Sequence, residues 1–278
     1  MFLKIYTVPY YNTFPLTCFL DEFLTQFSLT CDYPSHLGDL LTQGKADIAM
    51  MPVASMAFVE NCTIVSDAVI GCYGAVKSVK IYANKPLDKI EILALDNDSK
   101  TSVNLAQVIL REYFKNDRYQ TASFSQSDSA EEIAQRADAC VMIGDRALTY
   151  QPDEKMWRLQ VDLGELWLEK TGLPFVFAAW ITNADRETVQ QWESQEKITA
   201  LELARNKGVE NLSTIVANVI QKQKTSLQPP KFPMKPQLLE DYYRHNIVYK
   251  MTDAHREGLR LFFHLGKKHQ LFDKTREF

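Results

Sequence analysis

Hydroxyl side chains gather at one point of the sequence, directly after a short apolar run. The four apolar residues before Asp96 predict a buried strand that ends there. Apolar residues at helical spacing follow, and Ser99 is a suitable N-cap for the predicted helix. Ser99, Thr101 and Ser102 would then stand where unpaired backbone N–H groups and the positive end of the helix dipole favour a carboxylate or phosphate. Ordinary capping without a ligand is the alternative.

Small polar side chains also follow or precede other predicted strands. Asn12 lies just after the alternating strand 2–8, and its amide can both donate and accept hydrogen bonds. Ser55 follows the strand 47–52, which ends at a proline, and Ser78 lies in the alternating segment 75–82. Open α/β sheets bind ligands at the carboxyl ends of their strands, so these residues are candidates for a common site. A turn-forming role is the alternative for Asn12.

Few residues are suitable for proton transfer. Gly144 and Asp145 follow the predicted strand 139–143, and the carboxylate of Asp145 is available as a base. An acidic residue at this place is equally typical of a helix cap. His36 follows Ser35 in a predicted short helix, where a histidine on the exposed face is the simpler interpretation.

The elements that must position these residues form two blocks of alternating strands and helices, followed by a helical tail. This order predicts an α/β protein with two lobes around a cleft: residues 1–84 with 183–278 form lobe 1, and residues 85–182 form lobe 2. An aromatic-rich strand within 171–180 would cross back to lobe 1. Aromatic side chains of the crossings would wall the cleft, with core packing as the alternative for each: Tyr73, Phe175, Phe177 and Trp180. Polar groups at one end and apolar walls at the other favour a small, carboxylated, partly unsaturated ligand.

Composition excludes several classes of function. The 278 residues are 46% hydrophobic and 24% charged, which is typical of a soluble globular protein. With 31 Lys and Arg against 35 Asp and Glu, no basic excess drives nucleic-acid binding. No apolar segment approaches the ~20 residues of a membrane helix, and the first residues show no export signal. The five cysteines lack metal-ligand spacing, which predicts reduced, buried thiols in a cytoplasmic protein.

Several motifs in the same order resemble one known family over roughly residues 3–182. They are Tyr11-Asn12-Thr13-Phe14-Pro15-Leu16, Pro34-Ser35, Ala46 to Ser55, Lys77-Ser78-Val79, Asp96 with Ser99 to Ser102, Ile143 to Leu148, Asp162-Leu163-Gly164 with Trp167, and Thr171 to Ala178. Together they are similar to the chorismate dehydratases of the futalosine route to menaquinone. The resemblance implies a fold like that of the type 2 periplasmic solute-binding proteins, with the ligand cleft between lobes.

The resemblance also implies a reaction. Chorismate loses its ring hydroxyl and a ring proton as water and gives 3-[(1-carboxyvinyl)oxy]benzoate, with no redox cofactor and no metal. We assign carboxylate binding to the hydroxyls of residues 99, 101 and 102, and orientation near the leaving hydroxyl to Asn12. Further substrate contacts are assigned to Ser55, Ser78, Gly144 and Phe175. Asp145 is the candidate catalytic carboxylate, although our hypothesis for the base is the substrate's own enolpyruvyl carboxylate.

Two other functions are compatible with these features. A small-carboxylate binding protein without catalysis would share the fold, because fold does not fix function. The paralogous 1,4-dihydroxy-6-naphthoate synthase is the other, and we expect its N-terminal loop to differ from Tyr-x-Asn-x-x-Pro-Leu. Turnover of chorismate would separate the dehydratase from both alternatives.

Overall fold

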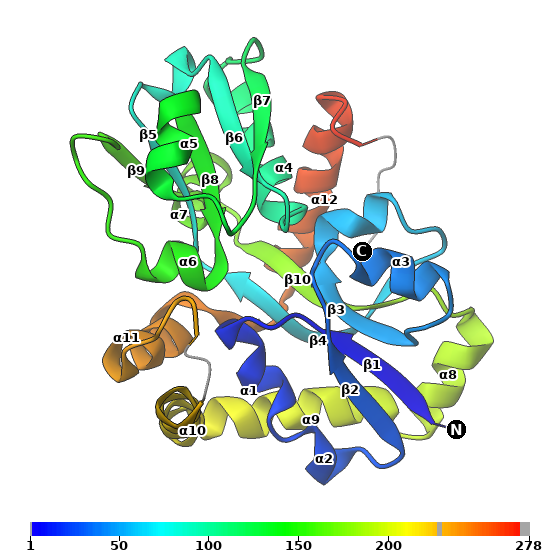
Figure 1. The fold of residues 1–278 in the computed structure, drawn as a ribbon. Coiled ribbons are helices and arrows are strands. Elements are labelled where there is room, and N and C mark those ends of the chain that lie inside the picture. Colours follow the sequence, from blue (N-terminus) through cyan, green and yellow to red (C-terminus); the bar gives the residue numbers. More distant parts are fainter. Residues whose placement is uncertain (1, 227–229, 273–278) are drawn as a thin grey trace.

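Two β-sheets organise the protein into two lobes, as Figure 1 shows for the computed structural model, which describes residues 2–226 and 230–272. The first sheet has the strand order β11-β4-β10-β3-β1-β2 and the second has the order β7-β6-β8-β5-β9. The strands of the first sheet are β1 (Leu3–Thr7), β2 (Phe27–Cys31), β3 (Ile48–Pro52), β4 (Thr63–Cys72), β10 (Phe175–Thr182) and β11 (Val248–Lys250). Those of the second are β5 (Val79–Ala83), β6 (Ile92–Asp96), β7 (Gln120–Phe124), β8 (Ala139–Ile143) and β9 (Leu159–Asp162).

The central strands are apolar because helices and loops cover both of their faces. The side chains of residues 48–51 in β3 are fully buried, and seven of the eight residues of β10 are buried. By contrast, β1 alternates between buried and partly buried residues, as its sequence pattern predicts. β1 runs parallel to β2 and β3, whereas β10 pairs antiparallel with β3 and β4. The parallel pairing directs the loops after β1 and β3 to one edge of the sheet.

The helices divide between the lobes. Those of the first lobe and the C-terminal part are α1 (Phe14–Thr17), α2 (Leu20–Phe23), α3 (Leu37–Thr42), α8 (Arg186–Ser194), α9 (Lys197–Glu210), α10 (Leu212–Thr225), α11 (Pro236–Asp241) and α12 (Asp253–Lys268). The second lobe contains α4 (Thr101–Tyr113), α5 (Ala130–Arg136), α6 (Gly144–Thr149) and α7 (Leu163–Thr171). No helix in the described ranges is long and apolar enough to span a membrane.

The lobe limits predicted at residues 84 and 182 assign two strands to the wrong lobe. β5 pairs with β8 and β9 in the second sheet, and β10 pairs with β3 and β4 in the first. The connections between the sheets therefore lie between β4 and β5 and between α7 and β10. The return of the aromatic-rich strand to the first sheet agrees with its predicted role as a crossing. The helical tail is also interrupted by β11, which adds to the edge of the first sheet beside β4.

Helix termini show two closed capping boxes and correct one prediction. Ser129 caps α5 and Thr252 precedes α12, each with reciprocal side-chain and backbone hydrogen bonds to the residue three positions on. Ser99 is not the N-cap of α4: the helix begins at Thr101, Lys100 precedes it, and no side chain caps it. The physical reason is a turn in which the Ser99 N–H donates to the Asp96 carbonyl at 3.2 Å, so the helix starts later.

The carboxylate of Asp162 fixes the first connection between the sheets. It accepts hydrogen bonds from the N–H groups of Val76 at 3.0 Å and Lys77 at 2.6 Å, and also from Gly164 at the start of α7. Gly164 must lack a side chain here, because a Cβ would lie 2.5 Å from the carbonyl oxygen of Gly74. This network holds the segment that carries Ser78 in place.

The ends of α4 and α12 are joined by polar contacts. Glu112 accepts from the Lys268 ammonium at 2.8 Å and lies 2.7 Å from His269 Nε2, while Arg111 donates to the His269 carbonyl. The Lys268 ammonium, and then His269, hold the pKa of Glu112 below its usual value despite partial burial. These contacts link the tail to the helix whose other end carries the candidate hydroxyls, and Figure 1 shows α12 beside α4.

The prediction of buried thiols was wrong for two cysteines. Cys62, Cys72 and Cys140 are buried, but Cys18 and Cys31 are exposed. Cys31 ends the edge strand β2, whose last three residues face solvent, and no sheet partner covers them on the far side.

Candidate functional site

A cavity lies between the two lobes, and we call it the inner cavity. Its first-lobe walls come from the loops after β1 and β3 and from β10, and its second-lobe walls come from the start of β5, the start of α4 and the end of β8. The lining residues are Val8, Tyr10, Asn12, Pro34, Pro52, Ile70, Val76, Ser78, Val79, Asp98, Ser99, Thr101, Ser102, Ile143, Gly144, Phe177 and Ala178. Six of the nine predicted site residues are among them.

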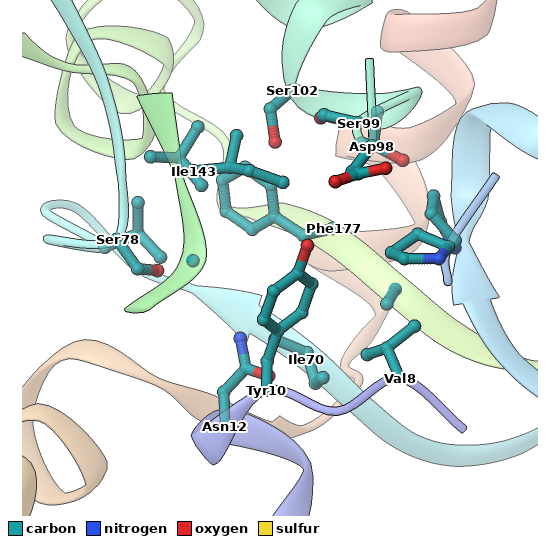
Figure 2. Close-up of a pocket in the computed structure, with 17 residues that line it drawn as sticks. Val8, Tyr10, Asn12, Ile70, Ser78, Asp98, Ser99, Ser102, Ile143 and Phe177 are labelled. Atoms are coloured by element: carbon teal, nitrogen blue, oxygen red, sulfur yellow. The ribbon is translucent and has the colours of Figure 1, made fainter. Parts of the chain in front are cut away.

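The hydroxyls at the start of α4 form one polar end of the inner cavity, as Figure 2 shows for Ser99 and Ser102. Thr101 Oγ1 accepts a hydrogen bond from the Ala54 N–H at 3.1 Å and so ties α4 to the loop after β3. The hydroxyls of Ser99 and Ser102 bond to no group in the part of the chain that the structure describes. Because α4 also lacks a side-chain cap, two hydroxyls and the helix's own N–H groups remain for an anionic ligand.

The other polar end brings together three parts of the chain. Asn12 Nδ2 donates to the Tyr242 hydroxyl at 3.3 Å, and that hydroxyl donates to Ser78 Oγ at 2.8 Å. Tyr242 is almost fully buried, and burial raises its pKa, so it stays a donor. Asn12 Oδ1 is buried without a hydrogen-bond partner among the described residues. An unpaired buried amide oxygen is costly, which favours a ligand donor at this position.

The tail positions Asn12 in a way that sequence patterns did not indicate. Tyr242 and its neighbour Tyr243 lie in a π-helical turn that continues α11. The Tyr243 hydroxyl donates to the Tyr11 carbonyl at 2.7 Å, next to Asn12. Two tyrosines more than 200 residues away therefore fix the loop after β1, and only tertiary contacts reveal this.

Tyr10 and Asp98 also line the inner cavity and were missed. The Tyr10 hydroxyl lies in the middle of the cavity below Ser99 and Asp98 in Figure 2. Gln126 Nε2 donates to this hydroxyl at 3.5 Å, which leaves the phenol proton free to reach a ligand. Burial, and then the nearby carboxylates of Asp96 and Asp98, raise the pKa of Tyr10, so the phenol remains protonated. Its place between Pro9 and Asn12 was the signal that could have identified it.

Gly144 supports Tyr10 by having no side chain. Its φ of +61° lies in the left-handed region, and a Cβ there would stand 3.0 Å from Tyr10 Cε1. The predicted contact of Gly144 with the cavity is thus a backbone contact that lets a first-lobe ring pack against the second lobe.

Asp145 does not line the inner cavity. It lies in the first turn of α6, accepts a long hydrogen bond of 3.4 Å from the Tyr11 N–H, and faces a second hollow described below. Burial raises the pKa of Asp145 to about 7, with the Tyr11 N–H acting in the opposite direction. A carboxyl group that titrates near neutral pH is suited to proton transfer in general, but its position separates it from the hydroxyls of α4.

Ser55 and Phe175 lie behind the inner cavity rather than on its wall. Ser55 is 1% exposed in the turn after β3, and its hydroxyl has no partner in the described part of the chain. Phe175 is fully buried because its ring packs between Trp167 and Phe262 and against Phe177, which alone reaches the cavity. The other two aromatic candidates do not line the inner cavity either: Trp180 is fully buried in the core, and Tyr73 is 69% exposed.

The inner cavity combines hydroxyl and amide groups at two ends with apolar walls between them. Among the described residues no positively charged side chain lines it and Asp98 is its one carboxylate, so an anion would be held by hydroxyls and helix N–H groups. Among residues 2–226 and 230–272, no cluster of three His, Cys, Asp or Glu side chains could hold a metal ion. The arrangement can orient a small ring with polar groups on opposite sides.

Comparison with known proteins agrees with this geometry. A chorismate dehydratase of Thermus thermophilus is 25% identical over 270 residues, which cover 91% of each chain. A crystal structure of a protein from Archaeoglobus fulgidus superposes with a TM-score of 0.74 at 10% identity, covering 97% of this chain and 98% of that one. The periplasmic aliphatic sulphonate binding protein of Escherichia coli superposes with a TM-score of 0.64 at 13% identity, covering 98% and 94%. These structural likenesses establish a periplasmic-binding-protein-like fold.

The family assignment comes from a model that spans almost the whole chain. The model described as menaquinone biosynthesis matches residues 3–268, which include both lobes and the tail up to the end of α12. The chain therefore belongs to this menaquinone-biosynthesis family.

Proposed function

We propose that the protein is a chorismate dehydratase, which removes water from chorismate to give 3-[(1-carboxyvinyl)oxy]benzoate. The observation that carries the proposal is the inner cavity, with free hydroxyls at the start of α4 facing Asn12 and Ser78 across apolar walls. The family and the Thermus thermophilus relative named for this reaction support it. The lyase class, the futalosine route and a cytoplasmic location belong to the same proposal.

The substrate is held at two ends. One carboxylate accepts hydrogen bonds from Ser99 and Ser102 and from the first N–H groups of α4, where the helix dipole favours negative charge. The ring lies against Phe177. This places the ring hydroxyl near Asn12, whose unpaired Oδ1 accepts from that hydroxyl and holds it in one orientation.

The elimination needs an acceptor for one ring proton. In our proposal the enolpyruvyl carboxylate of the substrate removes the proton from the ring carbon that bears the ether. The C–H electron pair becomes a ring double bond, the C–O bond to the hydroxyl breaks, and the proton and hydroxide leave as one water. Aromatisation drives the step, and the protein mainly positions the reacting groups. Asp145 is an unfavourable base because it does not line the inner cavity.

The test is turnover. The purified protein is incubated with chorismate, and products are followed by chromatography with mass detection. A product lighter than chorismate by one water is expected from the wild-type protein. Tight binding without turnover would instead favour a carboxylate-binding protein on the same fold, and an unchanged substrate without binding would reject both.

A further inference from the structure

A second hollow adjoins the inner cavity, and we call it the outer cavity. It shares Tyr10 and Ile143 with the inner cavity. Aromatic rings of Tyr11, Tyr33 and Phe232 contribute to its walls. The two cavities are therefore neighbours, and the question is what the outer one holds.

Tyr10 forms the partition between the two cavities. Its ring packs against the backbone of Gly144, and its hydroxyl accepts from Gln126, so two second-lobe residues hold a first-lobe side chain. Tyr10 and Ile143 are the residues that line both cavities, so these two side chains stand between them.

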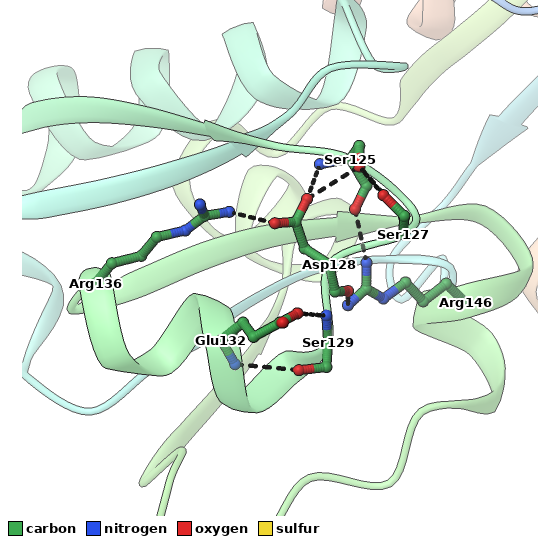
Figure 3. A network of polar contacts seen from close by, with 7 residues as sticks. All are labelled: Ser125, Ser127, Asp128, Ser129, Glu132, Arg136 and Arg146. Atoms are coloured by element: carbon green, nitrogen blue, oxygen red, sulfur yellow. Dashed lines mark hydrogen bonds and ion pairs between the residues drawn. The ribbon is translucent and has the colours of Figure 1, made fainter.

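Arg146 supplies one positive charge to the outer cavity. Its guanidinium donates to the carbonyl oxygens of Ser125 at 3.4 Å and Asp128 at 2.8 Å, as Figure 3 shows. The Asp128 carboxylate pairs instead with Arg136 at 2.8 Å and with the N–H and hydroxyl of Ser125. Within the described ranges Arg146 therefore has no carboxylate in direct contact, although it is only 7% exposed. The guanidinium carbon also lies 5.5 Å from the centre of the Phe124 ring, and its charge acts to lower the pKa of Asp96 against the effect of burial. A buried guanidinium held by carbonyl and aromatic partners retains its charge for an anion.

Lys231 supplies a second positive charge from the tail. Its ammonium donates to the Gln126 carbonyl and stands 5.7 Å from the centre of the Phe232 ring. Neither partner neutralises it. Among the described residues, the one acidic residue that lines the outer cavity is Asp145, and because burial raises its pKa to about 7, it is partly neutral at that pH. The outer cavity therefore carries a positive balance beside aromatic surface.

We propose that the outer cavity is a second binding site, which takes an aromatic carboxylate by Arg146, Lys231 and the Phe232 ring. The choice of ligand class rests on the proposed function, because that reaction forms an aromatic dicarboxylate next to this compartment. The site itself follows from the charges, the rings and the Tyr10 partition. Cations beside aromatic faces are a general means of holding such ligands.

The test is a calorimetric titration of the full chain with isophthalate, a rigid aromatic dicarboxylate. We expect a binding component that Lys231→Met weakens by about tenfold, since a charge-assisted contact is lost. Lys235→Met is the matched control, because Lys235 is an exposed lysine four residues away that lines neither cavity. Phe232→Ala should weaken the same component. Ser102→Ala should leave it unchanged.

The proposal is overturned if Lys231→Met and Phe232→Ala bind isophthalate with the same affinities as Lys235→Met. It is also overturned if the component that depends on Lys231 responds equally to Ser102→Ala, because the two cavities would then be one site. Failure of the proposed function is recognised separately: chorismate is not turned over, yet the Lys231-dependent binding of isophthalate persists.

Discussion

The helices α4 and α5 lie in the same lobe, yet their N-termini are satisfied in different ways. At α5, Ser129 Oγ accepts from the Glu132 N–H at 3.2 Å, and the Glu132 carboxylate accepts from the Ser129 N–H at 2.7 Å. Figure 3 shows these reciprocal bonds beside the Arg146 contacts. At α4, no side chain caps the helix, and the hydroxyls of Ser99 and Ser102 face the inner cavity of Figure 2.

The difference teaches how to separate a structural serine from a candidate binding serine. A serine in a closed capping box has used its hydrogen-bonding capacity within the chain and stabilises the helix. A serine at an uncapped terminus that faces a cavity keeps its capacity for a ligand. Substitution should therefore affect stability at α5 and ligand binding at α4.

The largest effect is expected at the end of the inner cavity opposite α4. Asn12→Ala removes the amide that orients the leaving hydroxyl, and we expect kcat for chorismate dehydration to fall by about 100-fold or more. Steady-state kinetics measure this. Asn97→Ala is the control, because Asn97 is exposed in the loop before α4 and lines neither cavity. Equal activity of the two variants would remove Asn12 from the mechanism.

At α4 itself, Ser102→Ala removes one donor to the substrate carboxylate. We expect kcat/KM to fall by about tenfold, which corresponds to one hydrogen bond to a charged group. The melting temperature should change little, since the Ser102 hydroxyl has no partner within the described residues. If the variant melts several degrees lower with unchanged kinetics, Ser102 has a structural role like that of Ser129 and does not bind the substrate.

Asp145→Asn tests the carboxyl group that faces the outer cavity. Burial raises the pKa of Asp145 to about 7 in the folded state, so the folded protein binds its proton more tightly than the unfolded chain. This contribution to stability is complete below the unfolded pKa and is lost as pH rises through about 7. The variant should therefore melt a few degrees above the wild type at pH 8 and show no gain at pH 4.

Asp185→Asn is the control, because the pKa of Asp185 is shifted in the opposite direction to that of Asp145. The Thr188 N–H donates to the Asp185 carboxylate at 2.7 Å and holds its pKa below the usual value, so this substitution should not stabilise the protein at pH 8. Turnover should survive in Asp145→Asn. Loss of turnover with retained binding would identify Asp145 as the base and reject the substrate carboxylate in that role.

The smallest effect is expected at α5. Ser129→Ala opens the capping box and should reduce the free energy of unfolding by about 1 kcal/mol, as measured by denaturant titration. The kinetics with chorismate should stay those of the wild type. A tenfold loss of kcat/KM in this variant would mean that the capping comparison does not separate the two kinds of serine.

Local patterns predicted most of the elements that carry the site. The strand before Asp96 and the helix that follows it are visible because each depends on periodicity within a short window. The alternation of strands and helices likewise predicted two lobes. The lobe limits in the structure differ from the predicted ones at β5 and β10. The reason is that the sheet in which a crossing strand pairs depends on partners far away in sequence.

The residues that sequence reasoning missed depend on tertiary contacts. Tyr242 enters the site from the tail, where nothing local links it to Asn12. Phe175 and Phe177 share a face of β10, but packing decides that only Phe177 reaches the cavity. The turn that delays the start of α4 depends on a backbone hydrogen bond to Asp96, which a preference for serine caps does not reveal.

The most direct test of the account is a crystal structure with 3-[(1-carboxyvinyl)oxy]benzoate bound. The account predicts one ligand carboxylate at the start of α4, within hydrogen-bonding distance of Ser99 and Ser102, with the ring against Phe177. A ligand bound elsewhere, with the inner cavity empty and both serines without a contact, would contradict the assignment of α4 as the binding helix.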